Sequence, residues 1–143
     1  MPKINPVSIF LPMLVIVALT FVATLRLAMM RQAAVKAGQD PKFYRAQLGA
    51  PEPEATVVAV RHYSNLFELP VLFYAACLTA YVLAAVSGWT LAFAWTYAAA
   101  RLMQSAIHLT YNTPAHRGLA FVAGVLCMLA LWINLALAVF ARI

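Results

Sequence analysis

Three polar residues near the start of an apolar segment, Arg61, Asn65 and Glu68, are the residues best suited to chemistry in this chain. They stand at positions i, i+4 and i+7, so a helix would place all three on one face. Glu68 is the only acidic residue in any strongly apolar stretch, because the other three acids share one polar loop. A carboxylate at membrane depth is costly unless it is paired, and such residues usually mark function. The spacing therefore predicts a polar binding face on this segment.

A later apolar segment has a polar stripe of its own. Its members are spaced 4, 3, 4 and 3 residues apart and so share one helical face: Tyr97, Arg101, Gln104, His108 and Tyr111. Glu68 and Arg101 each lie 11 residues from the ends of their segments that we place on the same side of the membrane. A buried hydrogen-bonded pair costs far less than an unpaired charge. We therefore expect Glu68 and Arg101 to form an ion pair.

Two further arginines, Arg26 and Arg117, lie near the same side of the predicted membrane and complete a basic rim. With Arg61 and Arg101 they give four guanidinium groups around one carboxylate. Because only one of them is needed to pair with Glu68, the cleft is net positive. A guanidinium group binds a carboxylate through two parallel hydrogen bonds. The natural occupant is a small ligand with more than one carboxylate.

Each of these residues also has a purely structural explanation. Arg26 and Arg117 could be headgroup anchors at the membrane interface. His108 could be a core histidine, since the spacing of the three histidines gives no metal site. Tyr97 and Tyr111 could be interface aromatics. The converging polar groups could also be only interhelical contacts, worth about 1–2 kcal/mol.

The elements that must position these residues are transmembrane helices. The 143-residue chain is 65% hydrophobic and 10% charged, with a mean hydropathy of +0.85, which is typical of a small integral membrane protein and not of a nucleic-acid-binding one. We predict one all-α domain, a four-helix transmembrane bundle over residues 8–30, 57–86, 89–112 and 118–141. Pro70 should kink the second helix and free the carbonyl of Leu66.

Basic residues are distributed unequally between the two predicted sides of the membrane. One side has Arg31, Lys36, Lys42, Arg45 and Arg117, and the other has Lys3, the N-terminal amine and Arg142. The positive-inside rule places both termini outside and the 31–56 loop in the cytoplasm. The first apolar run is too long for a cleavable signal peptide and is predicted to be a membrane span.

The pattern Arg61-x3-Asn65-x2-Glu68, followed by Arg101 and Arg117 sixteen residues apart, resembles the MAPEG family, the membrane-associated proteins of eicosanoid and glutathione metabolism. The resemblance covers nearly the whole chain. The run FELPVLFY at residues 67–74 is similar to bacterial members whose substrates are mostly unassigned, which implies a bacterial inner membrane.

This resemblance implies a homotrimer that binds glutathione between subunits on the cytoplasmic side. Arg61, Asn65 and Glu68 would hold the polar groups of the tripeptide. Arg101 would brace Glu68, and Arg26 would reach in from the neighbouring subunit. The remaining implied role is that of Arg117, which would lie beside the thiol as the catalytic group. By their place on the polar stripe, Gln104, His108 and Tyr111 should also line the site.

The implied activity is that of a transferase or peroxidase, with glutathione as cosubstrate and a hydrophobic electrophile or lipid hydroperoxide entering from the membrane lipids. The alternative is a non-catalytic trimer of the same family that binds a small anionic or lipid ligand, or a structural protein. Three positions depart from the family's pattern. Pro70 follows Glu68 by only two residues, His108 replaces a tyrosine, and Gly118 replaces a serine found in one branch.

Overall fold

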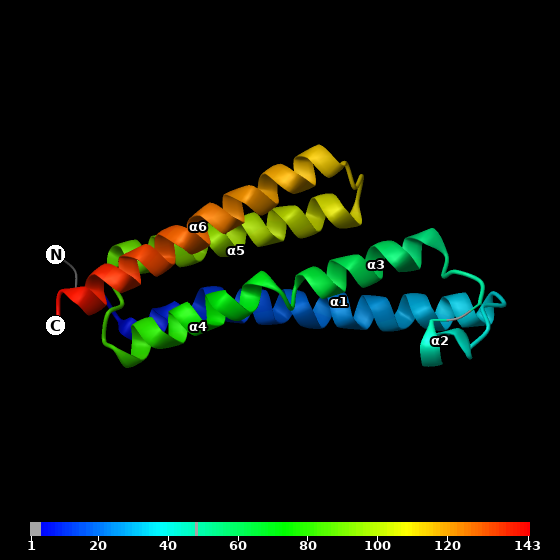
Figure 1. Cartoon of the computed structure of the whole chain (residues 1–143), viewed down its shortest axis with the longest axis horizontal. Helices are drawn as coiled ribbons and strands as arrows, with labels where there is room; N and C mark the ends of the chain where they lie inside the picture. The colour runs from blue at the N-terminus through cyan, green and yellow to red at the C-terminus, as the bar shows by residue number, and fades with distance from the viewer. Residues whose placement is uncertain (1–3, 48) are drawn as a thin grey trace.

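The computed structural model describes residues 4–47 and 49–143, and every regular element in these ranges is helical. Lys3, which enters the topology argument, lies outside the described residues. The elements in chain order are η1 (Pro6–Ile9), α1 (Phe10–Lys36), α2 (Phe43–Ala46), α3 (Glu54–Asn65), α4 (Leu69–Val82), α5 (Gly88–Leu109) and α6 (Pro114–Phe140) (Figure 1).

Three helical stretches are long and apolar enough to cross a membrane, namely Pro6–Lys36, Glu54–Val82 and Pro114–Phe140. They correspond to three of the four predicted segments. The fourth segment forms α5, whose hydropathy is lowered by its polar stripe. Helix α1 continues past its predicted end at Met30 to Lys36, so it projects further than expected on the side of the basic loop.

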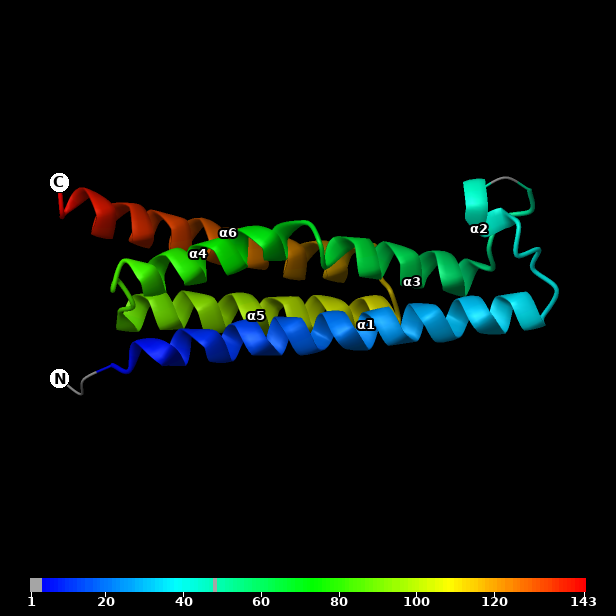
Figure 2. The same ribbon diagram turned by 90° about the horizontal axis from the view of Figure 1, so that it is seen from below.

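The helices form two long pairs, with α1 alongside α3 and α4, and α5 alongside α6 (Figures 1 and 2). The pairs pack closely near the chain termini, where Ile9, Ile16, Phe73, Tyr97 and Leu131 form a buried core. Toward the other end, the α5–α6 pair diverges from α3 (Figure 1). The polar residues of α3 and α5 lie in this diverging half.

The second predicted helix is interrupted, and this corrects the expectation of a single kinked helix over 57–86. Helix α3 ends at Asn65 and α4 begins at Leu69, with Pro70 in its first turn. Between them Glu68 has φ −89° and ψ −91°, which is not helical. Pro70 causes the break because its ring has no N–H and clashes with the preceding turn, whereas the first turn of a new helix accepts it readily.

Polar contacts secure both ends of the molecule. At one end, Arg31 Nε lies 3.2 Å from Glu52 Oε1, and the Arg31 guanidinium sits 5.2 Å from the ring centroid of Tyr44, which ties the loop to α1. At the other end, Arg142 donates to the carbonyls of Leu83 and Ala84, directly after α4. The residues just after α6 therefore bond to the segment that leads from α4 into α5.

Ala84 occupies a position that glycine would fill better. Helix α4 ends in a Schellman motif, in which the N–H groups of Ala84 and Ala85 bond to the carbonyls of Tyr81 and Ala80. This motif puts Ala84 at φ +48°, in the left-handed region. In this conformation the Cβ atom of alanine crowds the following carbonyl oxygen, which destabilises the folded protein relative to glycine.

Ala84→Gly should therefore stabilise the protein by about 1 kcal/mol and raise its thermal midpoint in detergent. Ala99→Gly is the matched control, because Ala99 is an exposed residue inside α5, where glycine should destabilise by about 1 kcal/mol. A lowered midpoint for both variants would contradict the strain assigned to Ala84.

Candidate functional site

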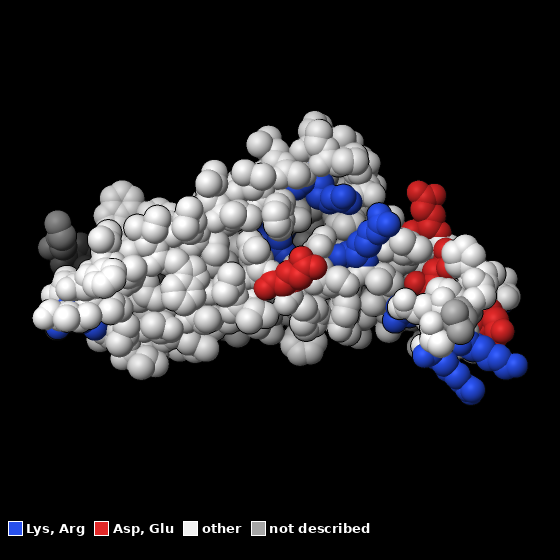
Figure 3. Space-filling model, in the orientation of Figure 1, with Lys and Arg blue, Asp and Glu red and all other residues white. Residues whose placement is uncertain are grey.

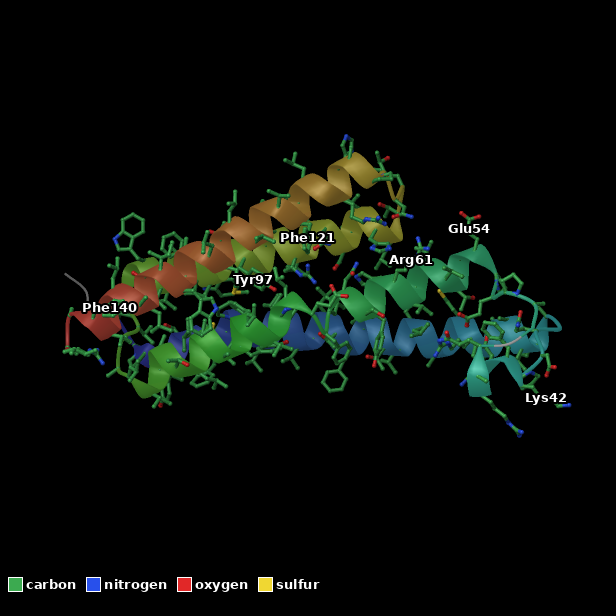
Figure 4. All side chains as sticks on the ribbon, viewed as in Figure 1. Lys42, Glu54, Arg61, Tyr97, Phe121 and Phe140 are labelled. Carbon is green, nitrogen blue, oxygen red and sulfur yellow. The ribbon has the colours of Figure 1, made fainter. Side chains whose placement is uncertain are left out.

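A cavity of about 290 Å³ lies where α3, the helix break, α5 and the start of α6 meet. Six of its seven lining residues are polar or charged; the lining consists of Val60, Arg61, Ser64, Asn65, Glu68, His108 and Arg117. Figure 3 shows basic side chains and an acidic one around a hollow in the middle of the molecule. In Figure 4, Arg61 projects from α3 toward the α5–α6 pair. Five of the predicted site residues are thus brought together by three helices and a break.

The local structure of α3 explains how one side of the cavity is built. Arg61 and Asn65 are one helical turn apart at i and i+4, so they share a face. Ser64 joins them and was not predicted, because a serine in a helix gives no distinctive signal. Glu68 lies at the break itself and is exposed, so its carboxylate can meet a ligand or water. Two guanidinium groups and one carboxylate give this cavity a net charge of +1.

Arg101 does not line this cavity, and its hydrogen-bond partners do not include Glu68, the predicted partner. It is 1% exposed, donates from Nη1 to Gln104 Oε1 at 2.6 Å, and donates from Nη2 to the backbone carbonyl of Asn65. Among the residues that the structure describes, no ion pair joins it to Glu68. The break provides the reason, because it leaves the last carbonyl of α3 available to a side-chain donor. Arg101 and Gln104 therefore stabilise the end of α3.

Arg117 is positioned by Asn112, a residue that was not predicted to belong to the site. It lies in the first turn of α6, and its Nη1 donates to Asn112 Oδ1 at 2.8 Å. Asn112 sits in the turn between α5 and α6 at φ +48°, a conformation that asparagine tolerates better than most residues. In the sequence, the one indication of this contact is an asparagine in the short connection between two predicted helices. The turn thus orients the guanidinium group of Arg117.

The predicted cleft with four arginines is divided in this structure. Arg26 lies in a second cavity of about 410 Å³ between α1, α3 and α5, together with Glu54 and Asn112. His108, which is 2% exposed, lines both cavities. The remaining two stripe tyrosines lie elsewhere.

Those two tyrosines, Tyr97 and Tyr111, line neither cavity. Tyr97 is fully buried and stacks on Phe73 of α4 with a centroid separation of 4.5 Å. Tyr111 is exposed, and its hydroxyl lies 3.3 Å from Nδ1 of His116. In residues 4–47 and 49–143, no group of three or more His, Cys, Asp or Glu side chains could hold a metal ion.

Arg101→Met should destabilise the protein strongly, because it leaves the carbonyl of Asn65 and the amide of Gln104 without their donor in an apolar interior. We expect a loss of about 2–4 kcal/mol, measured as a lowered thermal midpoint in detergent. Arg61→Met is the matched control, because Arg61 is exposed and should change stability by less than about 0.5 kcal/mol. Equal losses for the two variants would show that Arg101 has no special role at the break.

Comparison with known proteins agrees with this architecture. A model of the MAPEG family matches residues 9–137, which include every residue that lines the two cavities. No curated protein and no solved structure matches the chain. The family match and the three apolar helical stretches together make this a multi-pass integral membrane protein. Since the match covers nearly the whole sequence, the chain belongs to the MAPEG family.

Proposed function

We propose that the protein is a membrane-embedded, glutathione-dependent transferase or peroxidase that acts on hydrophobic substrates. The observation that carries this proposal is the cavity in which Arg61, Arg117 and Glu68 meet. Glutathione has two carboxylates, one amine and one thiol. Guanidinium groups suit the carboxylates, and the carboxylate of Glu68 suits the amine.

Arg117 is the group that we assign to the thiol. A thiolate is the reactive nucleophile, and an unperturbed thiol has a pKa of about 8.5. A guanidinium group beside the sulfur lowers that pKa and increases the thiolate fraction at neutral pH. The hydrogen bond from Arg117 to Asn112 supports this role, because it holds the guanidinium group at the cavity wall.

The placement of Arg26 supports a homotrimeric assembly. Within one subunit, Arg26 lines a different cavity from Arg61 and Arg117. In the proposed trimer, the Arg26 side chain of a neighbouring subunit would reach the glutathione that the first subunit holds. The many exposed apolar side chains, among them Phe21, Val71 and Leu119, provide surface for such neighbours and for membrane lipids.

We further propose that α5 is the fourth crossing, because it packs along α6 between connections at opposite ends of the bundle (Figure 1). Both termini would then lie outside a bacterial inner membrane. The two cavities and the loop that contains α2 would face the cytoplasm. The hydrophobic electrophile or lipid hydroperoxide would enter from the bilayer.

A non-catalytic, anion-binding or lipid-binding trimer is the second candidate. The observation that favours it is Arg101, whose guanidinium group is engaged by Asn65 and Gln104 instead of facing the cavity. The binding site for an anion is then intact, while fewer groups are free to act on the thiol. Measuring binding and thiolate formation separately distinguishes the two candidates.

Purified protein in detergent should bind glutathione saturably at millimolar concentrations or below, as measured by isothermal titration calorimetry. Arg61→Ala should weaken this binding by about tenfold or more, because it removes a charged hydrogen-bonding partner. Arg45→Ala is the control, since Arg45 is exposed on α2 and should leave the affinity unchanged. Absence of saturable binding by the unaltered protein would refute the glutathione site.

Glutathione bound to the unaltered protein should give the ultraviolet absorbance of a thiolate near neutral pH. Arg117→Ala, measured at saturating glutathione, should lower the thiolate fraction by roughly tenfold. Binding without any thiolate signal in the unaltered protein would favour the non-catalytic candidate.

A further inference from the structure

His108 is a buried polar group to which the proposed function assigns no chemical step. It is 2% exposed, and neither of its ring nitrogens has a hydrogen-bond partner among the described residues. The ring packs edge-on against His62, with 5.3 Å between centroids, and His62 is also buried with a free Nε2. Buried polar atoms are nearly always bonded, because leaving them unpaired costs free energy. Two unpaired imidazoles side by side therefore call for an explanation.

The position of His108 between two cavities provides that explanation. It is the one residue common to the linings of the cavity with Arg61, Glu68 and Arg117 and of the cavity with Arg26 and Glu54. An imidazole has two ring nitrogens, and each can give or take a proton. A ring placed between two polar cavities can therefore accept a proton from one and release it into the other.

The other residues of the first cavity are poor proton acceptors. Its two arginines stay protonated, and its serine and asparagine side chains are not bases. Glu68 is the ligand for the glutathione amine under the proposed function. His108 is thus the base that this cavity offers to a thiol.

We propose that His108 is the catalytic base that accepts the proton of the glutathione thiol, an inference that rests on the proposed glutathione site. The S–H bond breaks, an N–H bond forms on the ring, and the electron pair stays on sulfur as a thiolate beside Arg117. The proton on the opposite ring nitrogen then leaves into the second cavity and reaches solvent past Glu54. The charged and titratable groups around the ring come from every neighbouring element: Arg26 of α1, Glu54, Arg61 and His62 of α3, Glu68 at the helix break, and Arg117 of α6.

The test is stopped-flow measurement of thiolate absorbance after glutathione is mixed with full-length protein in detergent. His108→Gln keeps the size and polarity of the side chain but cannot accept the proton. It should still bind glutathione saturably by calorimetry and, at saturating glutathione, form thiolate about 100-fold more slowly or worse. It should also lose the rise of rate with pH that titration of the imidazole gives to the unaltered protein. His116→Gln is the matched control, because His116 is exposed and lines neither cavity.

Chemical rescue separates a base from a merely structural residue. Added imidazole should restore thiolate formation to His108→Ala and should leave His116→Ala unaffected. A third measurement uses the unaltered protein and so does not depend on the folding of any variant. This protein should form thiolate more slowly in D₂O than in H₂O. A normal rate and pH profile in His108→Gln, failed rescue of a folded His108→Ala, or equal rates in the two solvents would each overturn the role of His108. Absence of glutathione binding by the unaltered protein would instead overturn the proposed function.

Discussion

The contact between the Arg101 guanidinium group and the carbonyl of Asn65 is the interaction on which the rest of the site depends. An α-helix that stops inside an apolar bundle leaves carbonyl groups that need partners from elsewhere in the protein. Pro70 makes such a stop unavoidable, since the helix cannot run through it. Arg101 supplies the missing donor from the neighbouring helix, and Gln104 holds Arg101 in turn. The carbonyl left at the end of α3 is thereby satisfied.

The interruption has a direct effect on the chemistry of the cavity. In a continuous helix, Glu68 would follow Asn65 on a regular turn and could face Arg101. In the broken segment, Glu68 is exposed and lines the cavity, while the guanidinium group of Arg101 is engaged elsewhere. The carboxylate is therefore available to a ligand. One arginine has a structural task, and two others, Arg61 and Arg117, retain free charge for binding.

Much of this could be read from the sequence, and the limits have physical causes. Apolar length predicted the long helices α1 and α6, and helical periodicity placed Arg61, Asn65 and His108 on facing surfaces. The partner of Arg101 was predicted wrongly because depth counting assumes straight, continuous helices, whereas the break at residues 66–68 changes the register. Asn112 was missed because its role depends on a left-handed turn conformation. Arg26 and Arg61 lie on the paired helices α1 and α3 but line different cavities, and this depends on how α1 packs against α3, which no local pattern encodes.

The hydrogen bonds from Arg142 to the carbonyls of Leu83 and Ala84 connect the two helix pairs at one end of the bundle. This end contains the closely packed core, whereas both cavities lie between the pairs toward the other end. A helix of 22 residues is about 33 Å long, so a rotation of only about 5° at the joined end would displace the far end by roughly 3 Å. That displacement is comparable to the diameter of a water molecule. The width of the polar cavities therefore depends on the contacts at the joined end as well as on the bond from Arg101 to Asn65 beside the cavities.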